Sequence, residues 1–151
     1  MKSDTVMISS RELNDRLATS GLRLTAQRQQ VLAVLLARRD HPTAEEVFIR
    51  AKARMPDISL ATVYNCLEAL IRCGLLRQVQ LDRGAARYCP NMAEHSHFRC
   101  EICGRIYDIE LAPDALQPHL PRGFHVSHRE VSWHGECAEC ARSQTTHAFS
   151  K

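Results

Sequence analysis

Apolar residues recur every three or four positions through the first half of the sequence, which is the pattern of amphipathic helices. Polar caps and helix breakers divide this half into four predicted helices. They cover residues 9–19, 26–38, 44–55 and 60–73. Thr25, Thr43 and Ser59 stand where N-caps are expected, and Gly21 and Gly74 follow two of the helix ends. The N-terminal half is therefore predicted to be helical.

The fourth predicted helix is followed by two alternating stretches, residues 75–81 and 86–90, on either side of Asp82-Arg-Gly84. A glycine-containing turn between such stretches indicates a β-hairpin. Helices followed by a small hairpin predict a winged helix-turn-helix, in which the fourth helix enters the major groove of DNA. The alternative is a helical domain whose hairpin takes no part in binding.

In the C-terminal half the pattern changes to short strand-like stretches. The expected elements are strands within 98–110 and 125–135, a short helix within 113–120 and a fraying tail over 143–151. This order of elements predicts an α+β protein with two domains. The expected domains are a DNA-binding winged helix (1–90), a hinge (91–94) and a small α/β dimerisation domain (95–151).

Two CxxC motifs lie in the predicted C-terminal domain. They place four thiols in two tight turns at Cys100, Cys103, Cys137 and Cys140. Two such turns complete a tetrahedral shell for a structural zinc ion, whose binding adds folding free energy to a segment too short for a large core. Disulfide pairing is the alternative. Residues 1–10 contain no apolar run of signal-peptide length, which favours a reducing cytoplasmic location and therefore zinc.

Composition adds an asymmetry of charge between the two halves. The 151 residues carry a net charge of +3, and no stretch approaches the length of a membrane span. Residues 1–92 hold 14 Lys+Arg against 9 Asp+Glu, whereas residues 93–151 hold 6 against 8. A basic N-terminal half fits a nucleic-acid surface, although a solvated arginine-rich face is the alternative.

A second set of metal donors lies near the predicted hinge. His95 and His97 are two residues apart, so in an extended segment both imidazoles point to one side. Asp108 follows downstream, and His41 and Cys89 could approach from the DNA-binding half. A metal site built from both domains would act as a switch, because binding stabilises one interdomain angle over the others.

The residues together resemble the ferric uptake regulator (Fur) superfamily. The resemblance is carried by four stretches: His41-Pro-Thr-Ala-Glu-Glu, Ser59-Leu-Ala-Thr-Val-Tyr-Asn65, His95-Ser-His-Phe-Arg-Cys-Glu-Ile-Cys-Gly104 and Cys137-Ala-Glu-Cys140. It implies a homodimeric, metal-dependent repressor that binds double-stranded DNA at a palindromic operator. It also implies structural zinc on the four cysteines and a regulatory iron or manganese ion on His41, His95, His97 and Asp108. Candidate DNA contacts at the start of the fourth helix are Ser59, Thr62, Tyr64 and Asn65.

Within this superfamily the sequence looks most like the peroxide-sensing (PerR) branch, with one departure. Where that branch has an aspartate six residues before the first histidine of the pair, this chain has Cys89. A thiolate beside imidazole favours zinc, which gives the alternative of a zinc-responsive uptake regulator. Alternatively, the Cys89 thiol could itself be oxidised next to the metal and so act as a redox sensor. It could also be a small buried hydrophobic residue that closes the hairpin.

No catalytic residues are predicted. A zinc-dependent hydrolase is disfavoured because four thiolates leave no open metal position for water. A redox-active CxxC protein is the other rival, and thiolates bound to zinc would resist alkylation until the zinc is chelated.

Overall fold

The computed structural model describes residues 8–112 and 118–148. The chain divides into two compact units, residues 1–92 and 93–151. The proposed hinge, 91–94, spans this boundary, and its role as a hinge stays a prediction. Among the described residues, no helix combines the length and the apolar character needed to cross a membrane.

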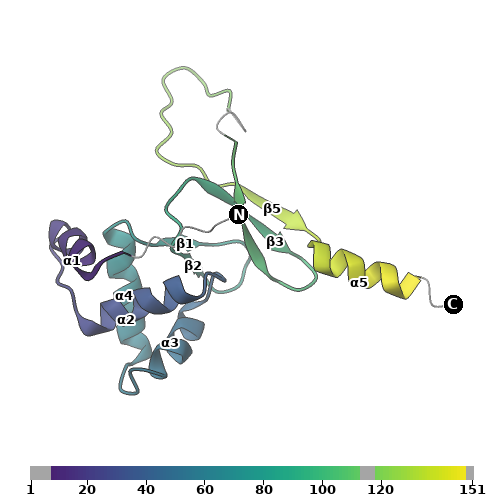
Figure 1. Ribbon diagram of the computed structural model, residues 1–151. Helices are drawn as coiled ribbons and strands as arrows, with labels where there is room; N and C mark the ends of the chain where they lie inside the picture. The colour runs from purple at the N-terminus through teal and green to yellow at the C-terminus, as the bar shows by residue number, and fades with distance from the viewer. Residues whose placement is uncertain (1–7, 113–117, 149–151) are drawn as a thin grey trace. The chain divides into compact units, whose positions relative to one another are not determined.

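Four helices form most of the N-terminal unit, and the sequence had predicted all of them (Figure 1). They are α1 (Ser10–Thr19), α2 (Ala26–Ala37), α3 (Ala44–Lys52) and α4 (Leu60–Arg72). Each begins at a side-chain cap that accepts a hydrogen bond from a backbone N–H. At α3 the Thr43 side chain accepts from the Glu46 N–H, and Glu46 accepts from the Thr43 N–H, which is a complete capping box.

The core of this unit lies between the apolar faces of these helices. Val31 and Leu35 of α2 and Leu67 and Leu70 of α4 are fully buried in it. The chain then reverses direction at Gly74, whose φ is +73°. Glycine adopts this left-handed conformation without the steric penalty that a side chain would impose. Helix packing of this kind is what holds the exposed side of α4 in a defined position.

A two-stranded ribbon completes the N-terminal unit. Strands β1 (Arg77–Val79) and β2 (Arg87–Cys89) pair antiparallel, with Gln78 opposite Tyr88. Tyr88 packs into the helical core, which anchors the ribbon to the helices. The expected helix-turn-helix with a hairpin wing is therefore present.

The C-terminal unit is a three-stranded sheet followed by one helix. Its elements are β3 (His95–Cys100), β4 (Ile106–Glu110), β5 (Ser132–Gly135) and α5 (Ala138–Ala148). The strand order is β4-β3-β5, with β4 antiparallel and β5 parallel to the central β3. The expected α+β class is confirmed.

Several boundaries in this unit differ from those that the sequence predicted. The stretch 98–110 is two strands, because a turn at 101–104 with Gly104 at φ +73° reverses the chain. Only the last four residues of 125–135 form a strand. Of the helix expected over 113–120, residues 113–117 lie outside the described residues and 118–120 are not helical.

The prediction of a fraying tail from residue 143 is wrong as far as residue 148. Helix α5 continues through this segment. Its first turn is fixed beside the second CxxC motif, where the Ala141 N–H donates to the Cys137 carbonyl, and the Ser143 hydroxyl donates to the Glu139 carbonyl. A helix nucleated at an anchored turn can propagate through polar residues that would not start one.

The packing of the core predicts that two aliphatic side chains of similar size, one buried and one exposed, contribute very differently to the free energy of unfolding. We expect Leu67→Ala, at a site that is 1% exposed, to lower the free energy of unfolding by about 2–5 kcal/mol through lost burial and the cavity left behind. The control Ile49→Ala, at a site that is 69% exposed, should change it by no more than about 0.5 kcal/mol. Urea denaturation followed by circular dichroism measures both. Equal losses would contradict this assignment of the core.

Candidate functional site

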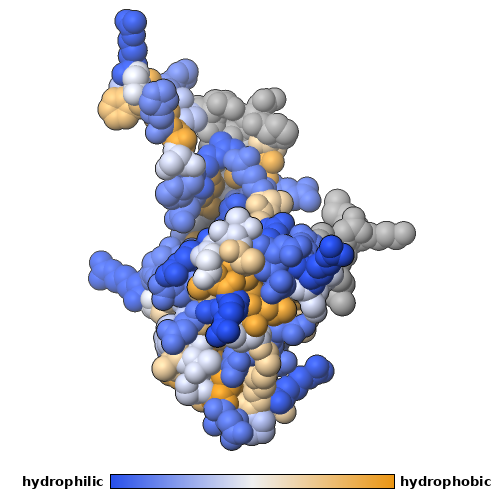
Figure 2. Space-filling model, turned by 90° about the vertical axis from the view of Figure 1, so that its left-hand side faces the viewer, coloured by the Kyte–Doolittle hydropathy of each residue, from blue (hydrophilic) through white to orange (hydrophobic). Residues whose placement is uncertain are grey.

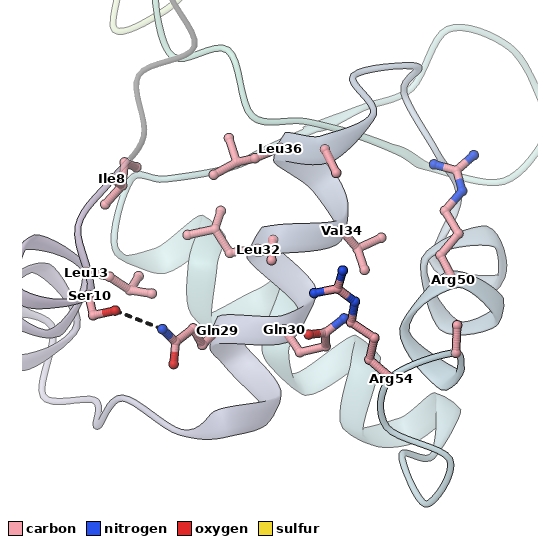
Figure 3. Close-up of a pocket in the computed structure, with 13 residues that line it drawn as sticks. Ile8, Ser10, Leu13, Gln29, Gln30, Leu32, Val34, Leu36, Arg50 and Arg54 are labelled. Carbon is pink, nitrogen blue, oxygen red and sulfur yellow. Dashed lines mark hydrogen bonds between the residues drawn. The ribbon is translucent and has the colours of Figure 1, made fainter.

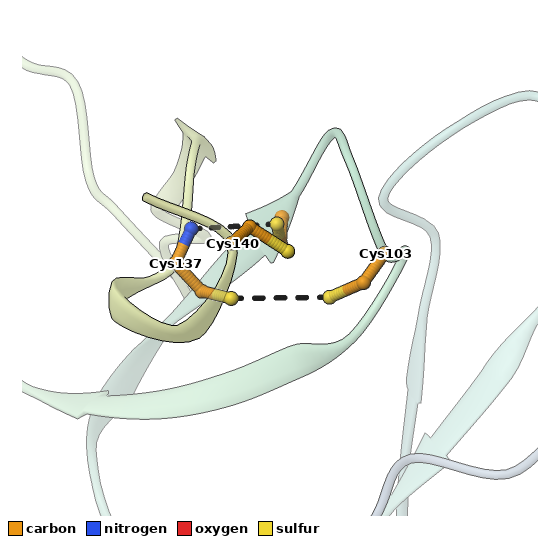
Figure 4. Close-up of side chains that lie close together, drawn as sticks. Cys103, Cys137 and Cys140 are labelled. Atoms are coloured by element: carbon orange, nitrogen blue, oxygen red, sulfur yellow. Dashed lines mark hydrogen bonds between the residues drawn. The ribbon is translucent and has the colours of Figure 1, made fainter. Parts of the chain in front are cut away.

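Four thiols converge in the C-terminal unit. Cys100 ends β3, Cys103 lies in the following turn, Cys137 precedes α5 and Cys140 lies in its first turn. Their Sγ atoms all lie within 4.8 Å of one another, and Figure 4 shows the labelled sulfurs pointing toward a common point. The structure therefore brings together all four cysteines that the sequence assigned to one ion.

The spacing of these sulfurs fits a tetrahedral zinc ion. Zinc–sulfur bonds of about 2.3 Å place tetrahedral sulfurs about 3.8 Å apart. The Sγ atoms of Cys103 and Cys137 are 3.9 Å apart. Four protein ligands fill the tetrahedral shell, so such a site is structural and leaves no position for a reacting water.

The backbone around the cluster favours the thiolate form that zinc requires. Backbone N–H groups, that of Cys103 first, lower the pKa of Cys100 to about 6. One of them, the Cys137 N–H, lies 3.3 Å from the Cys100 sulfur. The N–H of Cys140 likewise lowers the pKa of Cys137, whereas a hydrogen bond with the Cys137 sulfur raises the pKa of Cys140 to about 12. The four-cysteine cluster is therefore arranged to carry negative charge on the sulfurs of Cys100 and Cys137.

A second donor cluster occupies the other end of β3. His95 and His97 lie on the same face of the strand, and Asp108 of β4 is the direct cross-strand partner of His97. The two Nε2 atoms are 3.0 Å apart, and each is 3.5 Å from an Asp108 carboxylate oxygen. Donors about 2.1 Å from one ion and at right angles to each other lie about 3.0 Å apart. These three side chains therefore fit around a single divalent ion.

The tautomer of His95 is set by the backbone. Its Nδ1 lies 2.7 Å from the Ala93 carbonyl oxygen, which can only accept, so Nδ1 carries the proton. In the neutral ring Nε2 then presents its lone pair toward His97 and Asp108, as a metal ligand must. Sequence reasoning did not find this carbonyl, because no side-chain pattern marks it.

Two further donors meet within the N-terminal unit. His41 and Cys89 are 3% and 1% exposed, and their donor atoms lie within 4.8 Å of each other. The segment after His41 runs beside β2: the Tyr88 N–H donates to the Pro42 carbonyl, and Arg87 donates to the His41 carbonyl. These contacts bridge 46 positions of sequence and explain how the imidazole reaches the thiol.

The backbone of His41 has an unusual conformation. Its φ is +56°, and it is the one described residue other than glycine with a positive φ. Such a conformation costs on the order of 1–3 kcal/mol for a residue with a side chain, and persists where surrounding contacts enforce it. Here the paired segment beside β2 supplies those contacts.

The exposed side of α4 carries the candidate DNA contacts. Tyr64 and Asn65 are exposed, and Thr62 is half-buried. The Ser59 hydroxyl caps the helix by accepting from the Thr62 N–H at 3.1 Å. The Tyr64 hydroxyl donates to the Glu45 carboxylate at 3.1 Å, which raises the pKa of Tyr64. Glu45 was not predicted, because a contact between residues 19 apart on two helices leaves no local signal.

The N-terminal unit also has an apolar groove. Figure 2 shows apolar side chains gathered on one face of the molecule and surrounded by polar ones. The groove has a volume of about 620 Å³, with Leu13, Leu32 and Val34 among its walls (Figure 3). Its lining contains no acid, histidine or cysteine, so it offers neither acid–base chemistry nor metal donors.

Comparison with known proteins gives a consistent set of relatives. The ferric uptake regulator family model matches residues 19–134. The peroxide operon regulator of Bacillus subtilis is 31% identical over 144 residues, which cover 91% of this chain and 99% of that protein. The peroxide-responsive repressor PerR of Staphylococcus aureus is 32% identical over 136 residues, 85% of this chain and 91% of that protein. The peroxide stress regulator of Campylobacter jejuni has a similar structure, with a TM-score of 0.65 and 32% identity over 86% of this chain and 97% of that one.

The thiol cluster predicts how the protein depends on zinc. We expect Cys137→Ser to abolish tight zinc binding and unfold the C-terminal unit, because structural zinc contributes about 10–16 kcal/mol of binding free energy. Elemental mass spectrometry and circular dichroism measure the two effects. The control Cys73→Ala, at the C-terminal end of α4, should keep its zinc. Zinc retained at the wild-type level in Cys137→Ser would contradict the site.

Proposed function

Because this chain belongs to the ferric uptake regulator family, we propose that it is a metal-dependent DNA-binding repressor of transcription that responds to peroxide. The observation that carries this proposal is the pair of donor clusters at the two ends of β3. Four thiolates at one end suit a permanent zinc, whereas two imidazoles and a carboxylate at the other end suit an ion that exchanges. A protein of this kind is a regulator rather than an enzyme.

DNA binding is assigned to the N-terminal unit. In a winged helix-turn-helix the second helix of the motif, here α4, lies in the major groove. Its exposed Tyr64 and Asn65, with Thr62 beside them, are the side chains proposed to reach base edges. The Ser59 hydroxyl is engaged in capping, so its proposed role is to fix the N-terminus of α4 against the backbone of the duplex. The net positive charge of residues 1–92 supplies affinity that is independent of sequence.

The protein is proposed to act as a cytoplasmic homodimer on a palindromic operator. Two copies related by a two-fold axis present two copies of α4, so each reads one half-site about one turn of DNA from the other. Dimerisation is assigned to the C-terminal unit, as the sequence suggested.

Regulation is assigned to one ion held by donors from both units. His95, His97 and Asp108 form the C-terminal part of this proposed site, and His41 and Cys89 form the N-terminal part. An ion that binds both parts stabilises the arrangement in which they meet, and so couples metal occupancy to DNA affinity. An iron ion held here would supply the chemistry that reduces peroxide beside the imidazoles of His95 and His97. Oxidation of one of these imidazoles by the peroxide would remove a nitrogen donor, and repression would then be lost.

A zinc-responsive regulator is the second candidate, and the position of Cys89 favours it. Successive residues of a strand face opposite sides, so Cys89 points away from the core that receives Tyr88. Its thiol lies beside the His41 imidazole instead of filling space in that core. A sulfur and nitrogen donor pair binds zinc more tightly than manganese.

Removing one donor tests the metal dependence of DNA binding. We expect His97→Ala to keep the structural zinc but to lose the stimulation of DNA binding by added manganese, which we expect to be about 5- to 150-fold in the wild type, the usual range of allosteric coupling. The control is His134→Ala, an exposed histidine in β5 of the same sheet. Fluorescence anisotropy with a duplex selected by the wild-type protein measures the affinities. Full stimulation in His97→Ala would remove this residue from the regulatory site.

Replacing the thiol by a carboxylate tests the second candidate. We expect Cys89→Asp to lower the preference of the exchangeable site for zinc over manganese by about tenfold or more, because a soft donor is replaced by a hard one. Competition between the two metals, with both counted by elemental mass spectrometry, gives this preference. An unchanged preference would place Cys89 outside the metal shell and leave iron or manganese as the regulatory ion.

A further inference from the structure

Glu45 and Tyr64 connect the two helices of the DNA-binding motif. Glu45 lies in the first turn of α3 and Tyr64 in the second turn of α4, and the Tyr64 hydroxyl donates to a Glu45 carboxylate oxygen at 3.1 Å. The capping box of α3 uses the neighbouring Glu46, so the Glu45 carboxylate is not required for that cap. Tyr64 is nevertheless 45% exposed, so its side chain remains accessible to DNA.

This hydrogen bond restricts the Tyr64 side chain. An exposed aromatic ring otherwise samples several rotamers, and ordering it on binding costs affinity. With the phenol held by Glu45 before DNA arrives, that ordering has already occurred. The contact therefore favours whichever DNA sequence suits the held orientation.

The same contact sets what Tyr64 can offer to a base. Its one hydroxyl proton is donated to Glu45, so its oxygen can only accept a hydrogen bond from DNA. In the major groove the available donors are the amino groups of adenine and cytosine, and the ring can pack on a thymine methyl group. Donation to a phosphate oxygen would first require the contact with Glu45 to break.

The carboxylate also has an effect that does not depend on sequence. A negative charge next to the DNA-binding surface repels phosphates of any duplex. This repulsion weakens cognate and non-cognate binding alike, so it lowers affinity without changing the ratio between them. A role in discrimination must therefore come from the hydrogen bond to Tyr64.

We propose that Glu45 is a positioning residue for sequence recognition, holding the Tyr64 phenol in the orientation that reads a base. This inference rests on the proposed function, because it requires α4 to contact DNA. It assigns to Glu45 a role in specificity in addition to any stabilisation of the N-terminus of α3.

Three variants of the full chain separate the hydrogen bond from the charge. Glu45→Ala removes both, Glu45→Gln keeps an oxygen that accepts from Tyr64, and the control Asp57→Asn removes one charge from an exposed position just before α4. Binding is measured with zinc- and manganese-loaded protein to two duplexes. One is selected by the wild type from a random pool, and the other is a scrambled duplex of the same composition.

We expect the ratio of the two affinities to fall about two- to tenfold in Glu45→Ala, the range expected for freeing one ordered side chain. Glu45→Gln and Asp57→Asn should bind both duplexes more tightly and keep the wild-type ratio. Unfolding midpoints measured on the same samples show whether α3 has been destabilised. Equal ratios in Glu45→Ala and the wild type would overturn the proposal.

A double-mutant cycle with Tyr64→Phe supplies the decisive comparison. Phenylalanine has no hydroxyl, so in that background Glu45→Ala should leave the affinity ratio unchanged. The same fall in both backgrounds would mean that Glu45 acts without Tyr64, and would overturn the proposal while leaving the repressor function intact. A wild type that binds both duplexes equally would overturn the proposed function and this inference with it.

Discussion

The C-terminal unit depends on the convergence of four sulfurs. Its buried apolar side chains among the described residues are few, namely Ile106 and two of the cysteines themselves. So little buried surface contributes only a few kcal/mol, which cannot offset the entropy of ordering a three-stranded sheet. A zinc ion would close the gap by joining the end of β3 to the start of α5. The ion pair between Arg105, just before β4, and Glu139 of α5 also ties the sheet to this helix, but both side chains are exposed and the pair adds little stability.

The sheet carries this constraint to the second donor cluster. Strand β3 ends at Cys100 and begins at His95, so the residues that bind zinc and those that form the open cluster share one strand. Its pairing with β4 brings Asp108 opposite His97. A slip of one residue would turn Asp108 to the other face. Because Cys103 lies in the turn that joins β3 to β4, a zinc ion bound there would help to fix the register on which the proposed regulatory site depends.

The N-terminal unit, unlike the C-terminal unit, is stabilised by a hydrophobic core. Its long-range polar contacts position individual side chains. Packing of α2 and α4 leaves the polar side of α4 exposed without help from a metal. Two long-range contacts then adjust individual side chains: the segment after His41 beside β2, and the hydrogen bond between Glu45 and Tyr64. Both act on residues with proposed functions.

The amino-acid sequence by itself determined the four N-terminal helices, their caps, the hairpin and the four cysteines that form the proposed zinc site. Periodicity, capping and CxxC spacing act over a few residues, so these features can be read locally. Only the tertiary structure decided the parallel pairing of β5, the continuation of α5 past residue 143, the left-handed backbone of His41 and the contact of Glu45 with Tyr64. Each of these depends on strand register or on helix packing between distant segments, which no local pattern of residues encodes.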